Sequence, residues 1–91
     1  MTVDIVIPNY NGFALLKENL PQIIEETKRY EGLIIIIDDG SDKNEFDKLS
    51  NFVKGKNILL LRNEKNLGFS STVNKGVAKS NADFIVLLNT D

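Results

Sequence analysis

Four short runs of apolar residues, mostly β-branched or leucine, recur along the chain. They have the length of β-strands, and the second run contains no polar residue before the two acids that follow it. Strands without polar alternation are typical of a parallel sheet that is covered by helices on both faces. The runs predict strands at residues 3–7, 33–37, 58–61 and 84–88.

The segments between these strands carry apolar residues at spacings of three and four, which is the period of an amphipathic helix. A first helix is predicted from residue 13 to about residue 30, and Pro21 is expected to kink or restart it. Asp42 followed by Glu45 has the form of a capping box and predicts the start of a second helix. Gly55 is expected to end that second helix.

A third helix is expected after the third strand, capped by Ser70 or Ser71 and ending near Asn81. The elements therefore alternate as β-α-β-α-β-α-β. This order predicts an α/β fold of the Rossmann-like kind, with three layers (α/β/α) and a four-stranded parallel sheet. The expected strand order is 3-2-1-4, which puts the switch point between the first and fourth strands. No internal repeat or linker divides residues 1–91.

Composition narrows the possible chemistry. A formal net charge of −2 gives no reason to expect nucleic acid as a partner. The chain has no cysteine and no histidine, so thiolate metal sites and the usual general base are excluded, and any metal must be hard and oxygen-ligated. The start of the chain lacks the pattern of a signal peptide, and no apolar run approaches a membrane span. A cytoplasmic location is therefore expected.

Polar residues follow each predicted strand at its carboxyl end, in clusters that begin at Pro8, Asp38, Arg62 and Asn89. Parallel strands bring all four clusters to one rim of the sheet, where ligands bind in open α/β folds. The amino ends of the predicted strands carry no comparable polar clusters. This asymmetry favours a binding crevice at the carboxyl rim, although loops are polar in general.

The adjacent acids Asp38 and Asp39 are the most informative part of this rim. Helix capping explains Asp42, but it does not explain two neighbouring carboxylates in a tight turn above the sheet. Neighbouring side chains of a strand point opposite ways, so one acid is expected to face the crevice and the other to anchor the loop. An acid in this place often accepts hydrogen bonds from the ribose or base of a nucleotide.

Three positions between the third and fourth predicted strands are further candidates for a structural or binding role. Gly68 predicts a turn with positive φ or a close backbone approach. Gly76, inside the third helix, is interpreted as a small residue that lets the helix and the sheet pack closely. For Asn74 two interpretations stay open, because this amide could cap the helix or face the crevice. The phosphate-binding patterns G-x-G-x-x-G and G-x-x-x-x-G-K-[ST] are absent.

The stretches IPNYNG, IIDDGS, NLGF with NKG, and LLNTD follow one another in this order. Together they resemble the N-terminal half of a family-2 glycosyltransferase with the GT-A fold, over essentially the whole chain. The last motifs are similar to the rhamnosyltransferase-like branch. The resemblance implies inverting, metal-assisted transfer of a sugar from a nucleotide-diphosphate-sugar donor to an acceptor hydroxyl, in polysaccharide or glycoconjugate synthesis. The acceptor would be a glycan or a lipid-linked sugar, and the parent protein could lie at the inner face of the membrane.

The resemblance also implies a role for particular residues. Asp39 would hydrogen-bond the base of the donor. Asp91, the last residue of a DxD-like motif, would coordinate Mg²⁺ or Mn²⁺ on the donor diphosphate. Asn89 stands where that motif has its first acid and is the weaker candidate for a metal ligand. The nucleotide site implied in this way consists of Pro8, Asn9, Tyr10, Asp38, Asp39, Gly68 and Asn74.

In the family, the general base and the acceptor site lie beyond the DxD-like motif, and no residue of this chain matches that base. The chain is therefore expected to be a truncated piece of a longer domain, which binds donor weakly at best and transfers no sugar by itself. A second hypothesis is a non-catalytic α/β module. In that case, apolar surface exposed on the fourth strand would drive the formation of a homodimer.

Overall fold

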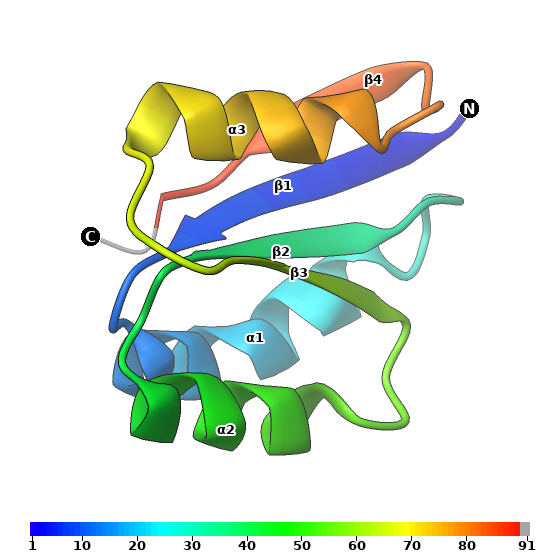
Figure 1. The fold of residues 1–91 in the computed structure, drawn as a ribbon. Helices are drawn as coiled ribbons and strands as arrows, with labels where there is room; N and C mark the ends of the chain where they lie inside the picture. Colours follow the sequence, from blue (N-terminus) through cyan, green and yellow to red (C-terminus); the bar gives the residue numbers. More distant parts are fainter. Residues whose placement is uncertain (90–91) are drawn as a thin grey trace.

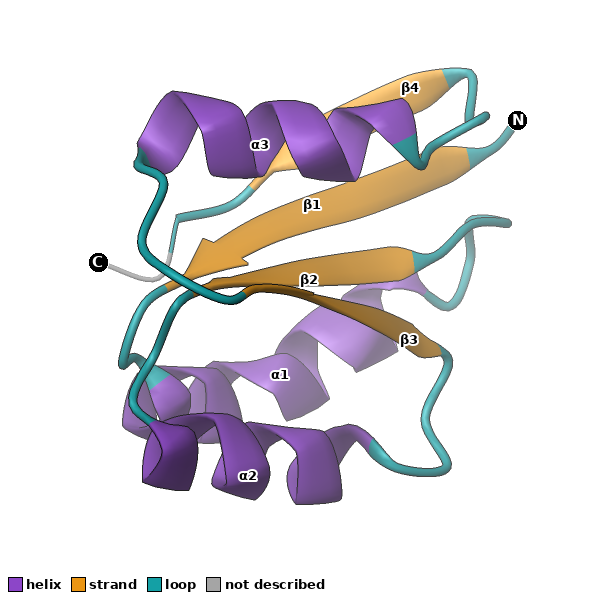
Figure 2. Cartoon of the chain, viewed as in Figure 1, coloured by secondary structure: helices purple, strands orange, loops and turns teal. Residues whose placement is uncertain are grey.

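The computed structural model describes residues 1–89, which form three helices and four strands in strict alternation. The strands make one parallel sheet in the order β3-β2-β1-β4. Helices α1 and α2 cover one face of this sheet and α3 covers the other (Figures 1 and 2). The predicted three-layer fold and strand order are confirmed. The elements are β1 Val3–Asn9, α1 Phe13–Thr27, β2 Ile34–Asp39, α2 Lys43–Val53, β3 Ile58–Asn63, α3 Phe69–Ala78 and β4 Phe84–Leu87.

The core lies on both faces of the two central strands. All six residues of β2 are buried, as expected for a strand that pairs on both edges and is covered on both faces. Alternate side chains of β1 and β2 enter different clusters, because neighbouring residues of a strand point to opposite faces. The cluster under α1 and α2 contains Ile5, Ile7, Leu16, Leu20, Ile34, Ile36, Leu49 and Val53, and the cluster on the α3 face contains Val6, Ile35 and Ile37.

Strands β1, β2 and β3 run two residues further than their apolar runs predict. The parallel ladder continues through Asn9 opposite Asp38, and through Asp39 opposite Asn63. All four of these polar side chains are buried. The predicted strand ends at residues 7, 37 and 61 were therefore wrong, because backbone pairing does not stop where the side chains become polar. The first polar residues of the rim consequently sit on regular, rigid backbone rather than in loops.

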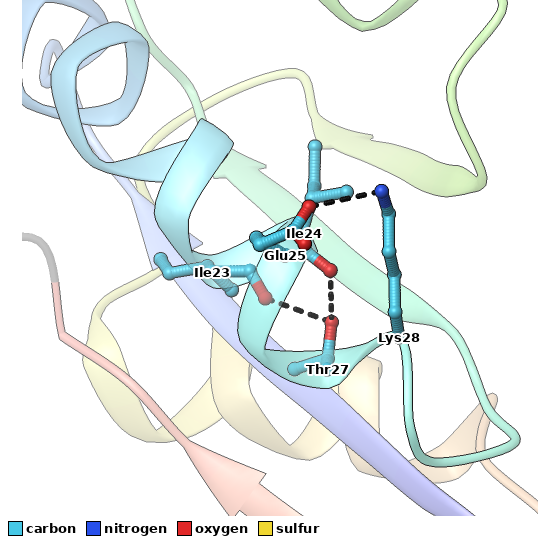
Figure 3. Close-up of polar contacts among 5 residues, drawn as sticks. All are labelled: Ile23, Ile24, Glu25, Thr27 and Lys28. Carbon is cyan, nitrogen blue, oxygen red and sulfur yellow. Dashed lines mark hydrogen bonds and ion pairs between the residues drawn. The ribbon is translucent and has the colours of Figure 1, made fainter.

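Helix α1 is continuous through Pro21 and ends at Thr27, earlier than the predicted residue 30. At this end the hydroxyl of Thr27 donates to the backbone oxygens of Ile23 and Ile24, at 2.8 and 3.2 Å (Figure 3). An exposed ion pair joins Lys28 to Glu25 in the same turn, and exposed pairs of this kind contribute little to stability. Within residues 1–89, no helix combines the length and the apolarity that a membrane span requires.

The start of α2 differs from the predicted capping box. Asp42 is the N-cap residue, but its side chain caps nothing. The carboxylate of Glu45 instead accepts a hydrogen bond of 3.3 Å from the backbone N–H of Phe13 at the start of α1. The backbone N–H of Asp42 donates to the side-chain oxygen of Asn11. These contacts tie the two helix starts to each other, which local sequence spacing cannot show.

Helix α3 begins at Phe69, and Gly68 is its N-cap residue with φ of +97°. The predicted caps Ser70 and Ser71 were therefore wrong, because both serines lie inside the first turn. The predicted positive φ of Gly68 is confirmed. A Cβ built at Gly68 would meet nothing within 4 Å, so the backbone conformation rather than crowding favours glycine here.

Gly76 lies where α3 packs closely against the sheet. A Cβ at this position would lie 2.4 Å from Cδ1 of Ile37 and 2.8 Å from Cγ1 of Val6. Both neighbours are fully buried and belong to the cluster on the α3 face. The interpretation of Gly76 as a small residue that permits close packing is confirmed.

We expect Gly76→Ala to destabilise the fold although alanine is the better helix former. Overpacking a core costs about 1–3 kcal/mol, while the gain in helix propensity is about 1 kcal/mol. Urea denaturation should therefore show a net loss of unfolding free energy. Ser70→Ala on the exposed side of α3 is the matched control and should not destabilise. A Gly76→Ala chain at least as stable as the unchanged chain would contradict this account of the α3 packing.

Candidate functional site

A cavity of about 250 Å³ opens at the carboxyl edge of the sheet. The ends of the strands and the starts of α2 and α3 lie together at this edge, on the left of Figure 1. Five of the seven residues predicted for the nucleotide site line the cavity, while Asp38 and Asn74 do not. The walls are made by Pro8, Asn9, Tyr10, Asp39, Asn66, Gly68, Phe69, Thr72 and Asn89.

A larger cavity, of about 310 Å³, lies at the opposite edge of the sheet. It is lined mainly by apolar side chains near the end of α1 and the start of β2, such as Ile24 and Leu33. Among residues 1–89, its ionisable lining residues are Lys28 and Tyr30, and no carboxylate lines it. Specific ligand sites combine an apolar wall with a few convergent polar groups. The smaller cavity at the carboxyl edge meets that description better, so cavity size does not decide between them.

The carboxylate of Asp39 is the central polar group of this cavity. Its Oδ1 accepts hydrogen bonds from the backbone N–H of Leu67, at 2.8 Å, and from Nδ2 of Asn63, at 3.0 Å. Its Oδ2 accepts one from the backbone N–H of Gly68, at 3.1 Å. The side chain is only 6% exposed. Asp39 therefore connects the end of β2 to β3 and to the turn that starts α3.

These contacts set the charge of Asp39. Burial is the largest single influence and by itself would raise the pKa of a carboxyl group. The hydrogen bonds from Leu67, Asn63, Thr72 and Gly68 act in the opposite direction, and together they lower the pKa of Asp39 below its ordinary value of 3.8. The cavity wall therefore carries a fixed negative charge at neutral pH.

A small network of side chains holds the carboxylate of Asp39 in place, and it consists of Asn63, Thr72 and Lys75. Nδ2 of Asn63 donates to both Asp39 and the hydroxyl oxygen of Thr72, which is 3.1 Å away. Oδ1 of Asn63 accepts a hydrogen bond of 2.9 Å from Nζ of Lys75. None of these three residues was predicted to be part of the site. The signal for Asn63 is its register, directly opposite Asp39, which emerges only if β3 is extended beyond its apolar run.

Asp38 points to the other face of the sheet from Asp39 and is fully buried. Its Oδ2 accepts a hydrogen bond of 2.9 Å from the backbone N–H of Ser41, and its Oδ1 accepts one of 3.3 Å from Nδ2 of Asn9. It thus anchors the loop before α2 and orients Asn9. We expected one acid to face the crevice and the other to anchor the loop, and these contacts agree with that expectation. In addition, Asp39 both lines the cavity and anchors a turn.

Asn9 contributes an unusual polar atom. Its Oδ1 is buried and has no hydrogen-bond partner among the described residues. The alternative amide orientation would place this oxygen against the carboxylate of Asp38, so the contact from Nδ2 to Asp38 supports the orientation seen. Buried polar atoms are nearly always paired in folded proteins, and an exception calls for an explanation such as a bound water or ligand.

Two exposed aromatic side chains complete the wall. Tyr10 is 52% exposed and Phe69 is 51% exposed, and both line the cavity. Large exposed rings beside polar groups are common where a protein binds a flat, partly apolar ligand. Asn74 is exposed on α3 and does not face this cavity, which favours neither of the two open interpretations.

The predicted metal ligands are only partly described. Asn89 lines the cavity, whereas Asp91 lies outside the described residues. Within residues 1–89, no three histidine, cysteine, aspartate or glutamate side chains gather in a way that could hold a metal ion. The metal site therefore stays a prediction from the motif.

The fold and the place of the cavity define the class of this protein. It is a doubly wound α/β domain whose polar cavity lies beyond the carboxyl ends of parallel strands, beside the switch point between β1 and β4. That is where open α/β sheets bind their ligands. Residues 4–91 match the family described as glycosyl transferase family 2, and the chain belongs to this family.

Individual relatives agree with this assignment. A glycosyltransferase of Methanocaldococcus jannaschii is 30% identical, with 98% of this chain and 31% of the relative covered. A dolichol-phosphate mannosyltransferase of Pyrococcus furiosus is 26% identical, with 100% of this chain and 26% of the relative covered. The chain thus spans less than a third of the length of either relative.

Solved glycosyltransferase structures share the fold. The mannosyltransferase PcManGT of Pyrobaculum calidifontis, in complex with GDP-Man and Mn²⁺, superposes with a TM-score of 0.85 at 18% identity and covers 98% of this chain and 27% of its own. TarS of S. aureus, in complex with UDP-GlcNAc, has a TM-score of 0.83 at 18% identity, with 100% of this chain and 27% of the TarS chain covered. At this level of identity, the likeness establishes the GT-A-like fold.

We expect Asp39→Asn to destabilise the chain by about 1–3 kcal/mol at neutral pH, because an amide cannot accept from all the donors that surround this carboxylate. A carboxyl group whose pKa is lowered by folding contributes stability above its unfolded pKa and loses it as the pH falls through the folded pKa. The difference between the two chains should therefore shrink below pH 3.8.

Urea denaturation across this pH range measures the effect. Asp47→Asn, on the exposed side of α2, is the matched control and should change stability little at any pH. A loss for Asp39→Asn that is the same at acidic and neutral pH would show that the charge of Asp39 is not what stabilises the turn.

Proposed function

We propose that residues 1–91 form the donor-binding part of a glycosyltransferase that transfers a sugar from a nucleotide-diphosphate sugar to an acceptor hydroxyl. The observation that carries this proposal is the cavity at the switch point, which combines the ionised Asp39 with the exposed rings of Tyr10 and Phe69. Membership of glycosyl transferase family 2 supports it. So do the nucleotide sugars named in the complexes of PcManGT and TarS.

In this proposal the cavity holds the nucleoside. The rings of Tyr10 and Phe69 offer flat apolar surface for a base, and the carboxylate of Asp39 accepts a hydrogen bond from a base N–H. Pro8 and Gly68 contribute backbone walls. Asp38 would not contact the nucleoside itself. It would act indirectly, because it holds Asn9 and the loop at Ser41 in position.

A divalent cation fits the donor atoms that this chain can supply. With no histidine and no cysteine, its metal ligands are limited to oxygen, which suits Mg²⁺ or Mn²⁺. We assign Asp91 as the carboxylate that would hold the ion, with Asn89 as the weaker candidate. Such an ion stabilises negative charge on the departing nucleoside diphosphate.

Inverting transfer also needs a general base to take the proton of the acceptor hydroxyl. The chain covers less than a third of the Methanocaldococcus jannaschii and Pyrococcus furiosus relatives, and we propose that the base and the acceptor site belong to the rest of such a protein. The acceptor would be a glycan or a lipid-linked sugar, reached from the cytoplasmic face of a membrane. The 91-residue chain would then bind donor without transferring sugar.

Isothermal titration of the chain with UDP, dTDP and GDP tests this function. At least one nucleotide should bind, and Mn²⁺ should strengthen binding if a carboxylate and the diphosphate share the ion. Asp91→Ala should abolish the effect of Mn²⁺ and leave metal-free binding largely intact. Asp47→Ala, far from the cavity on α2, is the control. The absence of any nucleotide binding, with or without Mn²⁺, would refute a donor site.

A second candidate is self-association, and the exposure of β4 favours it. All four residues of this strand are exposed, including Phe84 at 58% and Leu87 at 45%. Within residues 1–89, β4 is also an edge of the sheet, with backbone groups free to pair with another strand. A second copy of the chain is the partner that this candidate requires.

Sedimentation velocity at increasing concentration tests it. If β4 forms the contact, the unchanged chain should dimerise and Val86→Lys should remain monomeric, because a charge on the edge strand opposes pairing. Asn51→Lys, at an exposed position of α2, adds the same charge and is the matched control. A chain that stays monomeric, or a dimer unaffected by Val86→Lys, would rule out this contact.

A further inference from the structure

The larger cavity, at the amino edge of the sheet, has no part in the proposed donor site. It lies between the end of α1, the segment that leads into β2, and residues at the start of β1 and before β3. Its volume of about 310 Å³ falls at the lower end of the range that small-molecule sites occupy. It shares no lining residue with the cavity at the carboxyl edge, so a ligand here would bind independently of a nucleotide.

The wall of this amino-edge cavity is mainly aliphatic. Ile5 and Ile34, each 5% exposed, form its buried part, and Ile24 of α1 lies across from the sheet. Thr27 also lines the cavity, but its hydroxyl donates to backbone oxygens within α1 (Figure 3). Apolar cavities in proteins exclude water and take up apolar molecules. The wall therefore suits a segment of hydrocarbon chain.

The mouth of the cavity differs from the wall because it carries positive charge. The ammonium group of Lys28 is 2.9 Å from the carboxylate of Glu25 (Figure 3). Both side chains are exposed, and such a pair contributes so little that Lys28 can turn to another anion. A second cation is adjacent, since the guanidinium carbon of Arg29 lies 5.2 Å from the centre of the Tyr30 ring. Glu31 follows Tyr30 but does not line the cavity.

We propose that the amino-edge cavity binds the aliphatic chain of an amphiphile whose head group is an anion, either a carboxylate or a phosphate. The chain would lie between α1 and the sheet, against Ile5, Ile24 and Ile34, and the head group would meet Lys28 and Arg29 at the mouth. A free fatty acid and a lipid held in a membrane share this chemistry. Because the two cavities are separate, failure of nucleotide binding would not affect this proposal.

Isothermal titration of the 91-residue chain with hexanoate, octanoate, decanoate and dodecanoate, each below its micelle concentration, tests the site. Affinity should rise about fourfold for each methylene that is buried, and it should level off once the chain fills the cavity. Such a plateau is the sign of a cavity of fixed volume. No binding, or an affinity that rises without limit as in adsorption to a surface, would overturn the proposal.

Leu33→Asp tests the location of the site, because it replaces part of the apolar wall by a carboxylate. Decanoate should bind at least about tenfold more weakly to this variant. Leu15→Asp is the matched control, since Leu15 is 44% exposed against 38% for Leu33 and does not line the cavity. An equal loss in both variants would refute this location. If circular dichroism shows that Leu33→Asp is unfolded, the chain-length series on the unchanged chain still decides.

The head group is tested by comparing octanoate with octanol. The unchanged chain should bind octanoate about two- to fivefold more tightly, which is the effect expected of an exposed charge pair. The double variant Lys28→Gln/Arg29→Gln should bring this ratio close to one and leave octanol binding unchanged. Lys43→Gln/Lys48→Gln, at exposed positions of α2, is the matched control. A ratio that stays the same in the first double variant would contradict recognition of an anion.

Co-sedimentation with vesicles of phosphatidylcholine and phosphatidylglycerol distinguishes the two sources of such a chain. Vesicle binding that Leu33→Asp abolishes and decanoate inhibits would assign the cavity to a membrane lipid. Decanoate binding without vesicle binding would assign it to a free amphiphile. Vesicle binding that neither Leu33→Asp nor decanoate reduces would exclude this cavity as the point of membrane contact.

Discussion

The ionised carboxylate of Asp39 is the contact on which the carboxyl edge of this sheet depends. One buried side chain accepts hydrogen bonds from Asn63 on β3 and from the backbone of Leu67 and Gly68, before α3. A buried charge is costly unless it is well hydrogen-bonded, and here the donors more than compensate for burial. The position of Phe69 in the cavity wall follows from this contact, because the turn that leads into α3 is held by it.

The two edges of the sheet differ in how their buried polar groups are paired. At the amino edge the buried carboxylate of Asp4 accepts from the backbone N–H of Leu33 and from the hydroxyl of Ser80, so both of its oxygens are used inside the fold. At the carboxyl edge the buried Oδ1 of Asn9 has no partner among residues 1–89, and the ring of Tyr10 is half exposed. The buried polar atom without a partner in residues 1–89 therefore lies at the carboxyl edge, beside the smaller cavity. The larger cavity lies at the amino edge.

The errors of prediction share a cause. The apolar runs located all four strands, but the first three runs ended too early, because pairing of Asn9 with Asp38 and of Asp39 with Asn63 continues where hydrophobicity stops. The prediction of a capping box at the start of α2 was wrong for a related reason. Glu45 satisfies the backbone of Phe13 in another helix, so its partner is a neighbour in space and not in sequence. Both effects come from contacts between elements, which a local pattern does not contain.

The sequence by itself determined the alternation of strands and helices, the covered parallel sheet and the gathering of polar residues at one rim, because hydrophobic periodicity and crossover handedness act along the chain. It also indicated Asp39 and Gly68, whose chemistry and backbone conformation are local properties. Only the tertiary structure decided that Asp39 faces the cavity while Asp38 does not, and that Asn63 occupies one of its oxygens. These are facts of register and close packing, since a hydrogen bond between residues 24 apart exists only once β2 and β3 lie side by side.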